Sequence, residues 1–231
     1  MASSFVIPLE SNPDVLNKYL EKLGVASKYD LVDVFGLDDD GLNCVPRPTK
    51  ALILLFPVSD AYEEFRKKQD VELSAKPPTI PENLFFVRQY VRNSCGTMAL
   101  VHAVLNNLSS IELKDDSVMK KFYEKAKELT PEERGRLLEQ NSAFIEIHQA
   151  LAEEGQTAAP PSDEIANKHF ITLVSIGNEL FELDGSKNFP VSHGATSDEK
   201  FLFDAARVCK EFMARDPKEL NFTIMAYANA Q

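Results

Sequence analysis

Hydrophobic and polar residues follow one another along this chain with periods that change from segment to segment. Between residues 13 and 23 the apolar side chains recur every three or four positions, the spacing of one helix face; they are Val15, Leu16, Tyr19, Leu20 and Leu23. Asn12 is placed to cap the first turn, Pro13 suits the first helical position, and Gly24 follows the last apolar residue. The pattern predicts an amphipathic helix that ends at Gly24.

Three further segments within the first two thirds of the chain have patterns that predict secondary structure. The apolar run KALILLFPV, residues 50–58, is long enough for a strand that is buried on both faces. The charged segment 59–81, with two adjacent prolines, predicts a short helix followed by a surface loop. Thr130 with Glu133 three residues later is the signature of a capping box, so a helix should begin there and break near Asn141.

The C-terminal third alternates between helical and strand patterns. Residues 197–217, SDEKFLFDAARVCKEFMARDP, predict a capped helix that Pro217 ends, and residues 221–230 predict a closing strand. Helices and strands are mixed with uneven spacing and without strict βαβ repeats. This favours an α+β fold with a central, largely antiparallel sheet covered by helices. We find no internal repeat and no long low-complexity linker, so a single domain over residues 1–231 is expected.

Composition narrows the functional classes. A formal net charge of −11 disfavours nucleic acid as a partner and would attract a basic protein, although acidity can also serve solubility alone. The three cysteines are widely spaced and form no CxxC pair, so neither a disulfide framework nor a zinc site is indicated. The first residues resemble no signal peptide, and no apolar run has transmembrane length. We expect a protein of the cytosol or nucleus, without metal or cofactor.

Cys95 is the first residue with candidate chemistry. Apolar residues recur at helical spacing from Thr97 onward, which places Cys95 at or just before a helix N-terminus. The partial positive charge there favours a thiolate over a thiol, and the thiolate is the nucleophilic form. Gly96 has no side chain, so a carbonyl substrate could approach the sulfur closely. The alternative is a free cysteine that packs as a small hydrophobic residue, so the assignment depends on partners.

A predicted β-hairpin supplies two partners for the thiol. Residues 168–187 contain two apolar runs separated by Gly177 and Asn178; if these two form a tight turn, facing residues sum to 355. His169 and Asp184 then become diagonal neighbours on one face, with Cβ atoms about 7–8 Å apart at most, close enough for a hydrogen bond. The carboxylate would fix the imidazole tautomer and leave its other nitrogen to exchange a proton with sulfur. A three-residue loop would separate the two side chains.

The structural alternative keeps His169 as a strand-end residue and Asp184 as the start of the turn DGSK. The other three histidines lie in patterns that indicate no catalytic role. His102 and His148 lie within helical patterns and His193 lies in a predicted loop, so all three are interpreted as structural or surface residues.

Gln89 is the candidate oxyanion donor. It precedes the cysteine by six residues, and its carboxamide with the backbone N–H of Cys95 would form an oxyanion hole. The alternative is a glutamine that faces solvent.

Motifs along nearly the whole chain resemble those of the ubiquitin carboxyl-terminal hydrolases, a papain-like group of cysteine peptidases, in the order found in that family. They are PLESNP, LVDVFGLD, VPRP, LILLFP, RQYVRNSCGT, LTPEER, EGQTAAP, HFITLV, ELDG and HGATSDE. The resemblance is to the small single-domain members. It implies an α-β-α sandwich with the papain-like cysteine proteinase fold and a knotted backbone. It also implies Cys95 as nucleophile, His169 as general base and acid, Asp184 as orienting carboxylate and Gln89 as oxyanion donor.

The resemblance further implies that a loop over residues 152–168 is the active-site crossover, beneath which leaving groups pass. Glu10 and Asp33 are implied contacts to the basic face and tail of ubiquitin. The expected function is therefore a monomeric thiol hydrolase that removes small adducts from the C-terminal glycine of ubiquitin or of a close ubiquitin-like protein. Two alternatives stay open: a papain-like peptidase for unrelated peptides, and a module that binds and stabilises free ubiquitin with little turnover.

Overall fold

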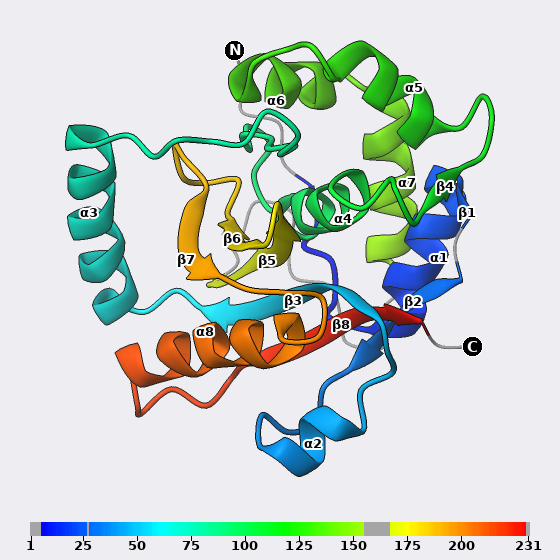
Figure 1. Cartoon of the computed structure of the whole chain (residues 1–231). Helices are drawn as coiled ribbons and strands as arrows, with labels where there is room; N and C mark the ends of the chain where they lie inside the picture. Colours follow the sequence, from blue (N-terminus) through cyan, green and yellow to red (C-terminus); the bar gives the residue numbers. More distant parts are fainter. Residues whose placement is uncertain (1–5, 27, 155–166, 230–231) are drawn as a thin grey trace.

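A six-stranded sheet with helices on both faces forms the body of the molecule (Figure 1). The computed structural model describes residues 6–26, 28–154 and 167–229. Most of the crossover loop predicted at residues 152–168 therefore lies outside the described residues. Within them, Ala152 ends a helix and Lys168 begins a strand.

The helices occupy both halves of the chain. Their bounds are α1 Pro13–Leu23, α2 Asp39–Asn43, α3 Asp60–Ala75, α4 Cys95–Leu105, α5 Val118–Ala126, α6 Pro131–Glu139, α7 Ser142–Ala152 and α8 Phe201–Arg215. The strands are β1 Val25–Ala26, β2 Tyr29–Asp33, β3 Thr49–Pro57, β4 Glu112–Leu113, β5 Lys168–Ile176, β6 Glu179–Leu183, β7 Val191–Ala195 and β8 Thr223–Asn229.

The main sheet has the strand order β2-β8-β3-β5-β6-β7, and all its neighbouring pairs are antiparallel. β1 and β4 form a separate two-stranded ribbon. The central strand β3 contributes to the core on both faces: Ile53 packs with one set of helices and Leu54 with the other. The predicted antiparallel sheet and the doubly buried strand are thus confirmed.

The two helical layers can be followed in Figure 1. Helices α1, α4, α5, α6 and α7 contribute to one apolar cluster, and α2, α3 and α8 contribute to the other on the opposite face of the sheet. The layering is that of an α-β-α sandwich, as expected.

Helix α1 has the bounds that its sequence predicts. The side chain of Asn12 accepts a hydrogen bond from the backbone N–H of Asp14, and Gly24 ends the helix with φ at 85°. The buried residues are the five of the predicted apolar face. The capping box of Thr130 and Glu133 is likewise present at the start of α6.

Two helices differ from their predictions. The helix predicted as short within residues 59–81 is α3, which has 16 residues. Its charges stabilise it, because Arg66 pairs with Glu63 and Asp70 at helical spacing. The cap predicted for α8 is absent: Lys200 occupies the N-cap position without a side-chain hydrogen bond.

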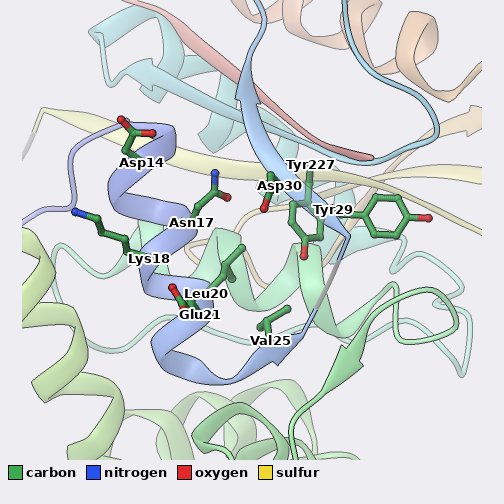
Figure 2. Close-up of a pocket in the computed structure, with 9 residues that line it drawn as sticks. All are labelled: Asp14, Asn17, Lys18, Leu20, Glu21, Val25, Tyr29, Asp30 and Tyr227. Atoms are coloured by element: carbon green, nitrogen blue, oxygen red, sulfur yellow. The ribbon is translucent and has the colours of Figure 1, made fainter. Parts of the chain in front are cut away.

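Asn17 of α1 covers the outer edge of strand β2. Its side-chain amide donates to the carbonyl oxygen of Leu31 at 3.0 Å and accepts from the backbone N–H of the same residue at 2.8 Å. Figure 2 shows Asn17 beside this strand, within a hollow of about 470 Å³ between α1 and the sheet edge. The amide thereby replaces the peptide group of a missing neighbouring strand.

Candidate active site

Cys95 is the first residue of α4 and is 7% exposed. Every residue of this helix is buried, so packing fixes the place of its N-terminus. Ser94, at the N-cap position, makes no side-chain cap; its hydroxyl donates instead to the carbonyl of Val91 at 2.8 Å. The N-terminal amides of α4 are therefore not occupied by a capping side chain, which leaves their positive potential to the sulfur.

Gly96 has a different role from the one its sequence suggested. A Cβ atom at this position would lie 3.2 Å from the side chain of Leu9 and 3.5 Å from the ring of Phe170. The missing side chain thus lets the N-terminal segment and β5 pack against the helix, and it does not open a path for a carbonyl substrate.

The predicted hairpin has the predicted register. Ile176 pairs with Glu179 and Thr172 with Leu183 along β5 and β6. Gly177 and Asn178 both have positive φ, at 60° and 63°, as a tight two-residue turn requires. The turn and ladder predicted from the sequence are therefore confirmed.

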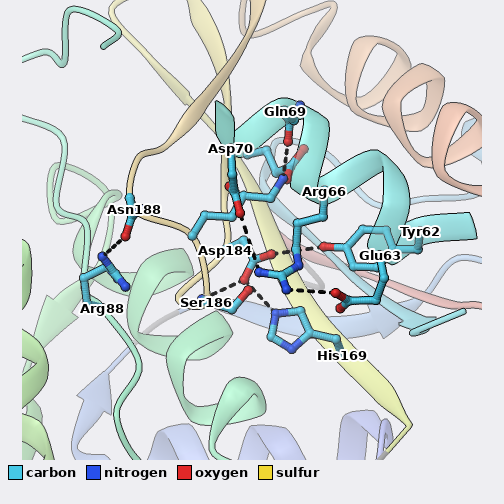
Figure 3. Close-up of polar contacts among 12 residues, drawn as sticks. Tyr62, Glu63, Arg66, Gln69, Asp70, Arg88, His169, Asp184, Ser186 and Asn188 are labelled. Carbon is cyan, nitrogen blue, oxygen red and sulfur yellow. Dashed lines mark hydrogen bonds and ion pairs between the residues drawn. The ribbon is translucent and has the colours of Figure 1, made fainter. Parts of the chain in front are cut away.

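His169 and Asp184 consequently meet on one face of the sheet (Figure 3). The distance from His169 Nε2 to Asp184 Oδ1 is 2.6 Å. Because Nε2 is engaged by the carboxylate, Nδ1 is the nitrogen left for the thiol of Cys95.

Asp184 is fully buried and accepts two further hydrogen bonds. The backbone N–H of Ser186 donates to Oδ1 at 2.8 Å, and the hydroxyl of Tyr62 donates to Oδ2 at 3.3 Å. Burial raises the pKa of a carboxyl group, but the charges of His169 and Lys187 and the hydrogen bonds from His169 and Ser186 outweigh it. The pKa of Asp184 is held well below its ordinary value, so the group is a carboxylate at neutral pH.

The electrostatics of the thiol and the imidazole favour a charged pair. Burial opposes ionisation of Cys95, yet interactions with the His169 side chain and the Phe170 backbone N–H lower the pKa of the thiol. Burial likewise opposes protonation of His169, but Asp184 raises the pKa of the imidazole above its usual value. The His169 side chain stays 14% exposed. The arrangement supports a thiolate beside an imidazolium.

Gln89 lies against the loop that carries Asp184. Its backbone N–H donates to the carbonyl of Gly185 at 2.8 Å, and a Cβ atom on Gly185 would lie 3.1 Å from Gln89 Cβ. Its Nε2 donates to the carbonyl of Val91 at 3.0 Å, which fixes the orientation of the amide. Among the described residues Nε2 has this one partner, so its second N–H remains to donate.

Glu10 and Asp33 are both half-buried and lie around the start of α1. Glu10 follows Leu9, which abuts Gly96 beside the cysteine. Asp33 ends β2, and burial followed by the charge of Asp14 raises the pKa of its carboxyl. It borders two hollows of about 630 and 550 Å³ that flank Phe35, whose side chain is 94% exposed.

Sequence reasoning missed a buried polar group beside Asp184. Lys187 Nζ lies 2.5 Å from Glu182 Oε1 and 2.6 Å from Gln69 Oε1. His193, predicted in a loop, is in strand β7 and its Nε2 lies 2.9 Å from Glu182 Oε2. The one local signal was a glutamate inside an otherwise apolar stretch of β6, and nothing in the sequence names its partners.

Metal-ligand clusters and membrane-spanning helices are both absent from the described ranges. No group of three or more His, Cys, Asp or Glu side chains there is placed to hold a metal ion. No helix in that part of the chain is long and apolar enough to cross a membrane.

A thiol at a helix N-terminus, beside an imidazole that a carboxylate holds, is the arrangement of thiol-dependent hydrolases. Comparisons with known proteins agree with this class. A family model described as "Ubiquitin carboxyl-terminal hydrolase, family 1" matches residues 6–214. A ubiquitin carboxyl-terminal hydrolase of Drosophila melanogaster is 51% identical over 224 residues, 97% of each chain. Isozyme L1 of Equus caballus is 44% identical over 223 residues, 96% of this chain and 98% of the relative.

The fold has a close match among solved structures. The catalytic domain of UCH37 from Trichinella spiralis, bound to ubiquitin vinyl methyl ester, superposes with a TM-score of 0.76 at 22% identity, over 96% of this chain and 94% of that one. The chain belongs to the ubiquitin carboxyl-terminal hydrolase family, and it is a cysteine-type deubiquitinating hydrolase.

Proposed function

We propose that this protein hydrolyses amide and ester adducts at the C-terminal glycine of ubiquitin through a Cys95, His169 and Asp184 mechanism. The observation that carries the proposal is the bond of 2.6 Å between His169 and Asp184, on a hairpin brought to a cysteine at a helix N-terminus.

In the first half-reaction the Cys95 thiolate attacks the glycine carbonyl, and an oxyanion forms. The backbone N–H of Cys95 and the second amide N–H of Gln89 would stabilise that charge. When the carbon–nitrogen bond breaks, the leaving amine takes the proton from Nδ1 of His169. A thioester between Cys95 and the ubiquitin carboxyl group remains.

In the second half-reaction His169, now neutral, accepts a proton from water, and the hydroxide attacks the thioester carbonyl. The thiolate leaves and the proton stays on His169, so the starting charge pair returns. Asp184 stays ionised throughout and orients the ring.

Ubiquitin is the proposed partner, because the fold neighbour is a catalytic domain bound to ubiquitin vinyl methyl ester. Glu10 lies one residue from the segment that abuts the nucleophile helix, and Asp33 stands beside the exposed ring of Phe35. These two carboxylates and this ring suit a partner surface that is both basic and apolar. The size limit on adducts, proposed to come from residues 152–168, concerns a segment that lies mostly outside the described residues.

The test is hydrolysis of a fluorogenic amide of the ubiquitin C-terminus. Cys95→Ala should abolish turnover, and His169→Ala should lower kcat by about a hundredfold or more, since general acid–base catalysis supplies about 10²–10⁴ in rate. Cys209→Ala is the matched control, because Cys209 is a cysteine of α8 that packs in the apolar cluster on the opposite face of the sheet from α4. Wild-type rates in Cys95→Ala, or hydrolysis of unrelated short peptides as fast as of ubiquitin, would overturn the proposal.

A further inference from the structure

Helix α3 touches the Asp184 loop at two points, although it is largely a surface helix. Tyr62 is the only buried residue of α3, all of which the structure describes. Its hydroxyl donates to Asp184 Oδ2 at 3.3 Å. Two turns further along α3, Gln69, which is labelled in Figure 3, accepts through Oε1 from Lys187 Nζ at 2.6 Å. Residues seven apart lie on the same helix face, so both contacts come from one side of α3.

The two carboxylate oxygens of Asp184 accept different numbers of hydrogen bonds. Oδ1 takes both His169 Nε2 and the backbone N–H of Ser186, whereas the structure gives Oδ2 one donor among the described residues, the Tyr62 hydroxyl. A carboxylate held through one oxygen can still turn about its terminal torsion, which is broad and roughly two-fold. The contact from Tyr62 restricts that rotation.

The Tyr62 ring is itself held in place by the core. Its centroid lies 4.6 Å from that of Phe56, edge to face, and 6.1 Å from that of Phe212. Phe56 in turn makes an edge contact with the His169 ring, with centroids 5.9 Å apart. Burial, followed by the negative charges of Asp184 and Glu182, raises the pKa of the Tyr62 hydroxyl, so it stays a neutral donor.

We propose that Tyr62 is a positioning residue of the active site: carried by α3, its hydroxyl orients Asp184 and through it the His169 ring. The inference rests on the proposed function, since it assigns Tyr62 to the same three-residue site. Helix α3 would then help to position the catalytic carboxylate, in addition to covering the surface.

The experiment is a double-mutant cycle on hydrolysis of the fluorogenic ubiquitin amide, with Tyr62→Phe, Asp184→Ala and the double variant. Tyr62→Phe keeps the ring and removes only the hydroxyl. We expect kcat to fall about three- to tenfold with KM unchanged, because that factor corresponds to the net free energy of one hydrogen bond. In the Asp184→Ala background the same change should have no further effect, because Tyr62 acts only through that carboxylate. Val71→Ala, an exposed position on α3, is the control.

Each outcome decides one question. Wild-type kcat in Tyr62→Phe, or an equal loss in both backgrounds, would overturn the positioning role. An equal loss would mean that the hydroxyl serves packing or stability, which the midpoint of urea unfolding would show independently. Wild-type kcat in Asp184→Ala would instead count against the proposed mechanism itself.

Discussion

At the scale of single residues, the site depends on which protons the thiol and the imidazole hold. The lowered pKa of Cys95 and the raised pKa of His169 both favour the charged pair. Burial alone would favour the neutral pair, so the carboxylate of Asp184 decides the balance.

The charged pair predicts an unusual pH dependence of alkylation. In a Cys44→Ala background, the rate of Cys95 alkylation by iodoacetamide should rise by much less than tenfold per pH unit between pH 6 and pH 8, because the lowered pKa of the thiol already favours the thiolate. Burial raises the pKa of Cys209 to about 12, so that thiol stays protonated and does not react with iodoacetamide over this pH range. With His169→Ala added, the rate should rise about tenfold per pH unit, as for an ordinary thiol of pKa about 8.5. A tenfold rise in the parent would contradict the charged pair.

At the scale of elements, the β5–β6 hairpin sets the site because its turn fixes the register. Asn178 sits at φ 63°, a conformation that asparagine tolerates and a β-branched residue does not. We expect Asn178→Val to lower the free energy of unfolding by about 1–2 kcal/mol, and Asn178→Gly to change it little. Urea unfolding of the two variants measures this. Equal stability of both would show that the turn does not need positive φ.

A chain of hydrogen bonds joins helices α1, α4 and α7 close to the nucleophile. His148 Nε2 lies 2.6 Å from the carbonyl of Ile7, which can only accept, so Nε2 carries the proton and Nδ1 accepts from Thr97 Oγ1 at 2.7 Å. Tyr19 then donates to Thr97 at 2.9 Å. This chain of hydrogen bonds joins α1, α4 and α7 two residues from Cys95, and it requires a neutral His148.

His148 therefore predicts a loss of stability in acid. Burial lowers its pKa to about 4, so between pH 6.5 and 4 the unfolded chain binds the proton more readily than the folded one. The stability contributed by the neutral ring is present above pH 6.5 and is lost toward pH 4, on the order of 3 kcal/mol. The difference in unfolding free energy between wild type and His148→Gln should shrink over that range. A difference constant with pH would refute this.

The sequence predicted contacts between neighbours in the chain better than contacts between distant segments. The bond from His169 to Asp184 follows from turn geometry, because only 15 positions separate the residues. The bond from Tyr62 to Asp184 spans 122 positions and that from Gln69 to Lys187 spans 118. No periodicity encodes such pairs, since they depend on how α3 lies across the finished sheet. The role of Gly96 was not predictable for the same reason, because its neighbour Leu9 comes from the distant N-terminal segment.

At the scale of the whole molecule, the net charge of −11 should act on the encounter with a basic partner. We expect kcat/KM for the ubiquitin amide to fall several-fold as salt rises, since exposed charges are screened beyond about 8–10 Å at physiological ionic strength. Asp33→Asn should flatten this salt dependence, and Asp116→Asn, at an exposed position on a distant loop, should not. A flat response in the wild type would argue against electrostatic steering.

Several expectations about the whole molecule stay predictions: the single domain, the monomeric state, the knotted backbone and the cytosolic or nuclear location. Family membership and the α-β-α layering stand without them.

The amide of Asn17, which closes the outer edge of β2, has a consequence for behaviour at high concentration. A bare strand edge can recruit a strand from another molecule and so begin aggregation. Here the N–H and carbonyl of Leu31 are already taken by a side chain of the same molecule. A single asparagine thus helps to keep a sheet-centred enzyme from polymerising edge to edge.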